Sequence, residues 1–205
     1  MLGLPKSTEL SQALPKTRIF AKFELRSTQK DRFDEDISRI TIVNEISQRK
    51  VPALHPGKEV QSIYVLEIQL KRKDYDPKNI QLLSKLIPQN ILFLLRYNDQ
   101  VQLAIYHTKL LMSEWGTEPE LVISGLDMDA VWENIVKTVG TIEVEEGNTL
   151  AEQITIDDEK AKLKLQIEQL EERSRKEKQP RKKLEMFEQL KEMKKQLEES
   201  IRNNL

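Results

Sequence analysis

No cysteine occurs among the 205 residues of this chain, and only two residues are histidine. The absence of thiols excludes disulfides, thiolate metal sites and a cysteine nucleophile. The six glycines are scattered singly, so the sequence has no glycine-rich loop of the kind that binds phosphate groups. His55 and His107 lie far apart in the sequence, which favours structural roles for both. We therefore expect no metal site, no cofactor and no catalytic residues, and predict that the protein is not an enzyme.

Long apolar runs are missing as well. The chain has no stretch of about 18 apolar residues, the length that a membrane-spanning helix needs. Its first residues, MLGLPKSTEL, lack the apolar segment of a signal peptide. We therefore expect a soluble, cytoplasmic protein without a membrane partner. The net charge of −1 also gives no overall positive field that would attract nucleic acid.

The residues that are present divide the chain into unlike parts. Hydrophobic residues make up 38% and charged residues 33% of the chain, as expected for an ordinary core followed by an exposed, charged helical segment. We predict a globular domain over residues 1–140 and an acidic linker over 141–157. A charged helical segment follows over 158–205. Residues 141–160 carry seven Asp or Glu and one Lys, whereas residues 161–205 carry thirteen Lys or Arg and nine Glu.

Apolar patterns within residues 1–140 alternate between those typical of strands and those typical of helices. They predict an α+β fold with a single mixed or antiparallel sheet of about five strands and three or four helices. The expected strands cover residues 40–46, 60–71, 91–97, 101–107 and 120–125. The expected helices are a short one after Ser7 or Thr8 and three more over 31–40, 76–87 and 126–140, the last ending at Gly140.

The C-terminal segment has a proline, Pro180, inside what otherwise reads as one long charged helix. Proline disfavours helix at the preceding residue but suits the first turn of the next helix. Apolar residues recur at spacings of four and three on both sides, as the seam of an antiparallel coiled coil requires. We predict a helical hairpin that reverses at Gln179 and Pro180; the alternative is one long, kinked helix that dimerises. The seam residues are Leu163, Ile167, Leu170, Met186, Leu190, Met193 and Leu197.

Basic residues gather at the predicted reversal, which becomes the tip of the hairpin. Such a tip is either a solvated turn or a site for phosphate groups or an acidic protein surface. Phe187 is the one aromatic residue nearby, so nucleic acid would be bound through its backbone rather than by base stacking. The basic tip consists of Arg173, Arg175, Lys176, Lys178, Arg181, Lys182 and Lys183, which surround the single acid Glu177.

One segment bears a faint similarity to a metal-dependent nuclease. Glu67, Gln69 and Lys71 alternate along an expected strand and therefore share a face. A carboxylate there would bind the metal ion, and the lysine would stabilise the attacking water. The missing acidic ligand would have to be Asp34 or Asp36. A half-exposed strand often carries such a trio without any catalytic role, so the nuclease is the less favoured alternative.

The order of motifs along nearly the whole chain resembles a bacterial family of uncharacterised proteins. The matching segments are LPKSTE, LPKTRIF, FDEDISRITIVNEIS, EVQSIYVLEIQLK, IPQNILFLLRYNDQVQLAIYHTK, the EW of SEWG, LDMDAVWENIVKTV and EKQPRKKLEMFEQLKEMKKQLEE. Members of this family are often encoded beside DNA methyltransferase and helicase subunits of restriction-type, anti-phage defence loci. One departure is Ile42, which stands where the family would have a tryptophan.

The resemblance implies a bacterial, cytoplasmic accessory subunit. Taken with the hairpin, it predicts a non-catalytic interaction protein that docks on a methyltransferase or helicase. The alternative is a nucleic-acid-binding adaptor that acts through the basic tip. Homo-oligomers through the coiled coil are a further option. Trp115, between two expected strands, is either a packing residue or an exposed anchor for the partner.

Overall fold

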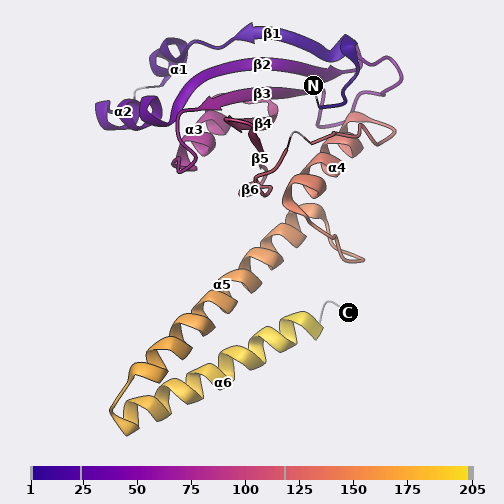
Figure 1. Cartoon of the computed structure of the whole chain (residues 1–205). Coiled ribbons are helices and arrows are strands. Elements are labelled where there is room, and N and C mark those ends of the chain that lie inside the picture. The colour runs from indigo at the N-terminus through magenta and orange to yellow at the C-terminus, as the bar shows by residue number, and fades with distance from the viewer. Residues whose placement is uncertain (1, 24, 118, 203–205) are drawn as a thin grey trace. The chain divides into compact units, whose positions relative to one another are not determined.

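The computed structural model describes residues 2–23, 25–117 and 119–202, with side chains as far as residue 199. It comprises two compact units, residues 1–142 and 143–205. The first unit is a mixed sheet with helices, and the second is a hairpin of two long helices (Figure 1). The α+β fold with a C-terminal antiparallel hairpin, predicted from the sequence, is confirmed.

The described residues of the first unit form one sheet of six strands. The strands lie in the sheet in the order in which they occur in the chain. β3 and β4 are parallel and all other neighbours are antiparallel, because the helix α3 (Lys78–Leu86) carries the chain back between β3 and β4. The strands are β1 (Glu9–Ala13), β2 (Ile37–Ser47), β3 (Ser62–Leu70), β4 (Asn90–Tyr97), β5 (Gln100–Tyr106) and β6 (Leu110–Met112).

Helices cover both faces of this sheet. After the short 3-10 turn η1 (Lys6–Thr8) and β1, the helices α1 (Lys16–Lys22) and α2 (Ser27–Asp36) pack with α3 on one face. The core there consists of Ile19, Phe33, Ile37, Ile40, Leu66, Ile68, Leu70, Tyr75, Ile80, Leu83, Leu86, Ile91, Phe93, Leu95 and Ala104.

The opposite face is covered by α4 (Met128–Gly140), which contacts β5 and β6. Leu103 and Ile105 are buried. They lie on this face because they alternate along β5 with Ala104, which belongs to the core on the other face. The side chain of Asp127 accepts a hydrogen bond from the Ala130 N–H at 2.9 Å and so caps the start of α4.

Several expected elements of the first unit differ from the structure. Residues 120–125 form no strand. Within this segment the Leu121 side chain is buried and the Leu121 N–H donates to the Leu2 carbonyl, whereas Val122 is 74% exposed. The strands β1 and β6 were not predicted. The short helix expected after Ser7 or Thr8 is replaced by η1 and β1, and α2 ends at Asp36 because β2 begins at the next residue. Thr141, not Gly140, adopts the left-handed conformation after α4.

A buried carboxylate joins α2 to the loop before α3. Asp36 is 0% exposed and accepts hydrogen bonds from Arg72 Nε at 2.5 Å, the Asp76 N–H at 2.8 Å and Asn79 Nδ2 at 2.8 Å. The Lys71 N–H also donates to the Asp36 carbonyl at 2.8 Å. These bonds fix the loop against the end of α2, since a buried carboxylate needs its full set of donors.

A second carboxylate, Asp129 at the start of α4, holds the loop before β3. It accepts the backbone N–H groups of Lys58 at 2.6 Å, Glu59 at 3.2 Å and Val60 at 2.8 Å. The N–H of Val60 is the largest cause that lowers the pKa of Asp129, and those of Lys58 and Glu59 add to it.

Asp129→Asn is expected to lower the stability of the first unit at neutral pH. Because the pKa of Asp129 is lowered in the folded state, its contribution is complete above the pKa of the unfolded chain. That contribution is lost as the pH falls through the lowered folded value. Urea midpoints measured from neutral to acidic pH should therefore converge for wild type and variant in acid. Glu133→Gln, which removes an exposed partner of Lys137, is the control and should change the midpoint little at any pH. A wild-type advantage that persists below both pKa values would contradict the role of this carboxylate.

The second unit begins with a loop that folds back on its own helix. α5 (Leu150–Lys176) starts at a capping box in which Thr149 and Glu152 bind one another's backbone N–H groups. The acidic linker predicted over 141–157 is therefore too long, because residues 150–157 are helical. α6 (Pro180–Arg202) completes the unit. Among the described helices, none combines the length and the apolar character needed to cross a membrane.

Candidate functional site

The chain reverses direction just before Pro180, as predicted. α5 ends at Lys176, and Pro180 is the first residue of α6, where its missing N–H costs no hydrogen bond. Between them Glu177 Oε1 accepts the Gln179 N–H at 2.8 Å. This bond is the largest cause that lowers the pKa of Glu177, with smaller effects from the Lys178 N–H and the charge of Lys182. The turn is therefore held by its one acidic residue.

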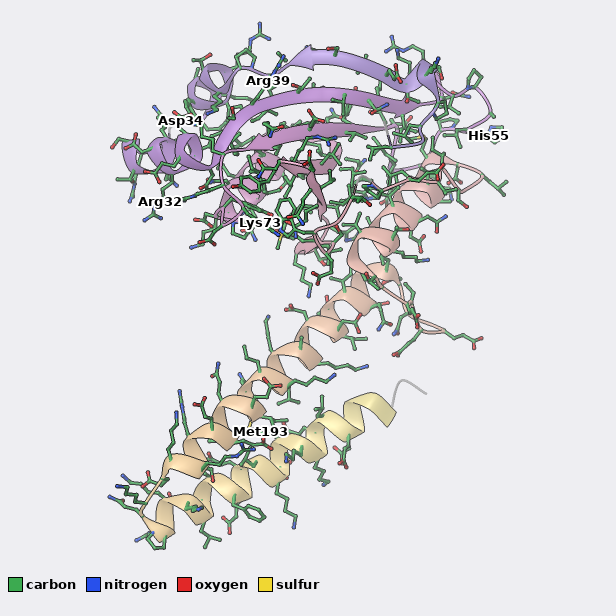
Figure 2. All side chains as sticks on the ribbon, in the orientation of Figure 1. Arg32, Asp34, Arg39, His55, Lys73 and Met193 are labelled. Carbon is green, nitrogen blue, oxygen red and sulfur yellow. The ribbon has the colours of Figure 1, made fainter. Side chains whose placement is uncertain are left out.

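The predicted seam residues lie where the two helices meet. Ile167 and Leu190 are 7% and 8% exposed, and the other five are partly buried. Met193 lies between α5 and α6 in Figure 2. Beside the seam, Lys194 of α6 binds Glu171 of α5 at 2.7 Å, which is the main reason for the lowered pKa of Glu171. The hairpin is thus joined by a narrow apolar stripe and an ion pair across it.

All seven residues of the basic tip are exposed. Three of them pair with a glutamate one turn away in their own helix: Arg175 with Glu171, Lys176 with Glu172 and Arg181 with Glu185. Such exposed pairs contribute only about 0.3–0.5 kcal/mol, so a partner can replace them at little cost. In the part of the chain that the structure describes, the remaining four form no ion pair: Arg173, Lys178, Lys182 and Lys183.

Beside the tip, one flank of the hairpin exposes large apolar side chains. Leu184 is 59% and Phe187 63% exposed. They are three residues apart and therefore lie on one side of α6. Leu184 was missed by the sequence reasoning, and Phe187 was considered only for stacking. In the sequence the two residues can be recognised because they are apolar although they lie outside the seam positions.

A hollow of about 380 Å³ opens on the same flank between the two helices. Ser174 lies at the next seam position after Leu170 and is partly buried, whereas Arg173 and Arg175 are exposed. A small side chain at a seam position leaves space that a leucine would fill. The hollow is lined by Glu171, Ser174, Arg175, Phe187, Leu190, Lys191 and Lys194.

Trp115 follows β6 in the chain, next to Gly116, whose backbone pairs with Val101 of β5, and it is partly buried. Its ring packs edge-on against Tyr75, with ring centres 6.4 Å apart, and Lys73 Nζ lies 5.4 Å from the Trp115 ring centre. Met112 beside it is 40% exposed and accepts a hydrogen bond from the Tyr75 hydroxyl. Trp115 is thus packed against the core, and only part of its ring is available to a partner.

The nuclease-like residues are placed in separate interactions. Glu67 binds Arg96 at 3.2 Å, and Lys71 Nζ donates to the Asp34 carbonyl. The Asp34 carboxylate binds Lys16 at 2.6 Å, while Asp36 is enclosed by the donors described above. Among the described residues, no three Asp, Glu or His side chains are grouped as a metal ion would require. Glu67 and Lys71 therefore each bind a different neighbour.

The two histidines take part in backbone and packing interactions. The His55 N–H binds the Leu126 carbonyl at 3.3 Å, and the His55 carbonyl accepts the Met128 N–H at 3.0 Å. Burial lowers the pKa of His107, which keeps its ring neutral at physiological pH. His55 lies at one end of the first unit, distant from Lys73 and Asp34 (Figure 2).

Comparison with known proteins gave one match. A family model described as "Domain of unknown function (DUF4391)" matches residues 2–197. No curated protein and no solved structure matches the chain.

Proposed function

Because the chain belongs to DUF4391, a family of domains of unknown function, we propose its role from its own residues: a non-catalytic interaction subunit that binds a protein partner through its helical hairpin. The observation that carries this proposal is the basic tip with exposed Leu184 and Phe187 beside it. Exposed apolar side chains with a charged surround are typical of protein interfaces. The match also confirms the expectation of an uncharacterised family.

The partner that we propose is a DNA methyltransferase or a helicase of a bacterial defence locus, in the cytoplasm. The support for this assignment is the resemblance drawn from the sequence motifs. The second unit suits such a role, because the reversal between its two antiparallel helices exposes a small, charged surface away from their seam.

A nucleic-acid adaptor is the second candidate, favoured by the seven exposed basic residues. Phosphate contacts from lysine and arginine would supply its affinity. Against it, Phe187 is the one aromatic side chain of the hairpin's sequence, so stacking of successive bases would have little support. Leu184 would gain nothing from a phosphate backbone. We therefore rank the protein partner first.

Reversing Arg175, Lys176, Arg181 and Lys182 to Glu is expected to abolish co-purification of the partner when the whole locus is expressed. Affinity of the remaining complex for DNA should stay unchanged. If DNA is the ligand instead, DNA binding falls, and the slope of log affinity against log salt flattens by about 3 to 4, since each phosphate contact adds about −0.9. The measurements are the mass of the purified complex and a salt titration of DNA binding.

The matched control reverses four exposed basic residues of the first unit: Arg32, Arg39, Lys78 and Lys85. Its change in net charge is the same, so a non-specific charge effect would appear in both variants. Unchanged partner and DNA binding in the tip-reversed chain would show that the tip is only a solvated turn.

A further inference from the structure

The apolar seam of the hairpin has a gap at Ser174. Leu163, Ile167 and Leu170 are spaced four and three, and the next seam position falls on Ser174. Fully packed coiled coils have apolar side chains at such positions. Here a hollow of about 380 Å³ opens beside Ser174, within the size range of pockets that accept side chains or small ligands.

Apolar surface continues from the hollow along α6. Phe187 lines the hollow and is 63% exposed, and Leu184 follows one turn nearer the tip at 59% exposed. Together with Leu190 at the floor of the hollow, they form an apolar strip on one flank. Exposure of two large apolar residues on a two-helix unit is unfavourable unless another surface covers them.

The charges around this strip define what can cover it. Arg175, Lys191 and Lys194 line the hollow, against one acid, Glu171, which pairs with both Lys194 and Arg175 and leaves a net positive charge. Arg181, Lys182 and Lys183 extend the positive charge toward the tip. A surface that combines apolar side chains with acidic ones therefore complements this flank, and a basic surface is repelled by it.

We propose that this flank is a docking groove for an acidic amphipathic helix of the protein partner. The inference rests on the proposed function and gives the chemistry of the partner. One apolar side chain of the incoming helix fills the hollow at Ser174, and the next one or two lie on Phe187 and Leu184. Anchors spaced three or four residues apart are how an amphipathic helix is recognised in a groove. Its acidic residues then face Arg175, Lys191 and Lys194.

Nucleic acid fits this groove less well, because it has no aliphatic side chain to fill the hollow. A second copy of the chain is the other rival. Its acidic helical segment, residues 150–159, carries four acids and no basic residue. Peptide binding and sedimentation distinguish these two alternative ligands from a helix of the partner.

The test uses the full-length chain and a synthetic helical peptide of about 18 residues, five turns long. The peptide has leucine at every third or fourth position, four glutamates beside these leucines and glutamine elsewhere, so that repulsion between like charges does not unfold its helix. A control peptide has serine in place of leucine and the same charge. Binding of each labelled peptide is followed by fluorescence anisotropy to wild type, Ser174→Leu, Ser174→Ala and Phe187→Ala.

Ser174→Leu places a leucine side chain in the hollow, where it blocks the anchor of the peptide. We expect it to weaken binding of the leucine peptide by about tenfold or more, the loss typical of a central anchor. The same variant should raise the melting temperature of the hairpin, because the added side chain completes its seam. Ser174→Ala leaves the hollow open and should bind as wild type does. Phe187→Ala should weaken binding without lowering helicity, since its side chain is exposed.

Equal affinity for the leucine and serine peptides, or unchanged affinity in Ser174→Leu, would overturn the groove. A dimer of wild type in sedimentation that becomes a monomer in Ser174→Leu would assign the groove to a second copy and overturn the partner helix. Loss of the partner on tip reversal, with peptide binding unaffected by Ser174→Leu, would overturn the groove while the proposed function stands. Because the groove variants change no charge, the two failures are distinguishable.

Discussion

Leu190→Asp is expected to unfold the helical hairpin and to leave the first unit folded. Leu190 is 8% exposed, and it faces a seam with few other buried residues. Placing an unpaired carboxylate in such a site costs several kcal/mol, because the charge loses its water without gaining a partner. Two helices that share so narrow a seam cannot absorb that loss, since isolated helices are only marginally stable.

Circular dichroism and tryptophan fluorescence together test this prediction. α5 and α6 contain 27 and 23 residues, so their unfolding removes a large part of the helical signal. Both tryptophans, Trp115 and Trp132, lie in the first unit and should keep their emission. Leu184→Asp is the matched control, because Leu184 is 59% exposed on the same helix and its replacement should preserve helicity. Full helicity in Leu190→Asp would rule out the seam.

Asp36→Ala is expected to lower the free energy of unfolding of the first unit more than Asp129→Asn or Asp34→Ala. The substitution leaves the Arg72 guanidinium, the Asp76 N–H and the Asn79 amide without their acceptor, and the Asn79 side chain is buried. Removing one partner of a buried charged network costs about 3–5 kcal/mol, and we expect the lower end because the Arg72 side chain is 50% exposed. That loss is a large fraction of the roughly 5–15 kcal/mol that stabilises a typical domain.

Asp34→Ala provides the comparison, two residues earlier on the same helix. The Asp34 side chain is 50% exposed and pairs with Lys16, so its loss should cost less than about 1 kcal/mol. Urea unfolding followed by tryptophan fluorescence measures both variants in the first unit. Equal midpoints for the two variants would show that the Asp36 network adds no more than a surface ion pair.

The hairpin could be predicted from the sequence because its determinants are local. The spacing of Leu163, Ile167 and Leu170, and the position of Pro180, define the two helices and their reversal without reference to the rest of the chain. β3, β4 and β5 were predicted for a similar reason, since the apolar patterns typical of strands are visible within each of these segments. The NDQ segment between these two apolar runs predicts the hairpin that joins β4 and β5, and in the structure Asn98 adopts the left-handed conformation at this turn.

The elements that were missed depend on distant parts of the chain. β1 is an edge strand in which four of five residues are exposed, so its residues lack the apolar pattern of a strand. It becomes a strand because β2 offers hydrogen-bonding groups to it. The helix predicted over 31–40 ended early for the opposite reason: Ile37 and Ile40 fit a helical spacing, but pairing with β3 makes them strand residues.

The groove flank was hidden in a different way. Leu184 and Phe187 are recognisable as unusual only after the seam of α6 has been located, because every amphipathic helix contains apolar residues. The hollow at Ser174 requires both helices to be in place, since its walls come from α5 and α6 together. Sequence spacing alone therefore indicated the tip but not the surface beside it.

The order of the strands in the sheet also bears on how the protein is made. Each strand pairs with the one that precedes it in the chain, so during synthesis every new strand finds its neighbour already outside the ribosome. No strand has to be inserted between two that have already paired, and each pairing within the sheet joins strands that are consecutive in the chain, which favours rapid folding. All six strands of the first unit can therefore pair before the hairpin is translated. An arrest series that stalls synthesis after successive strands should show protection from proteolysis rising stepwise from β3 onward, complete before α5 emerges.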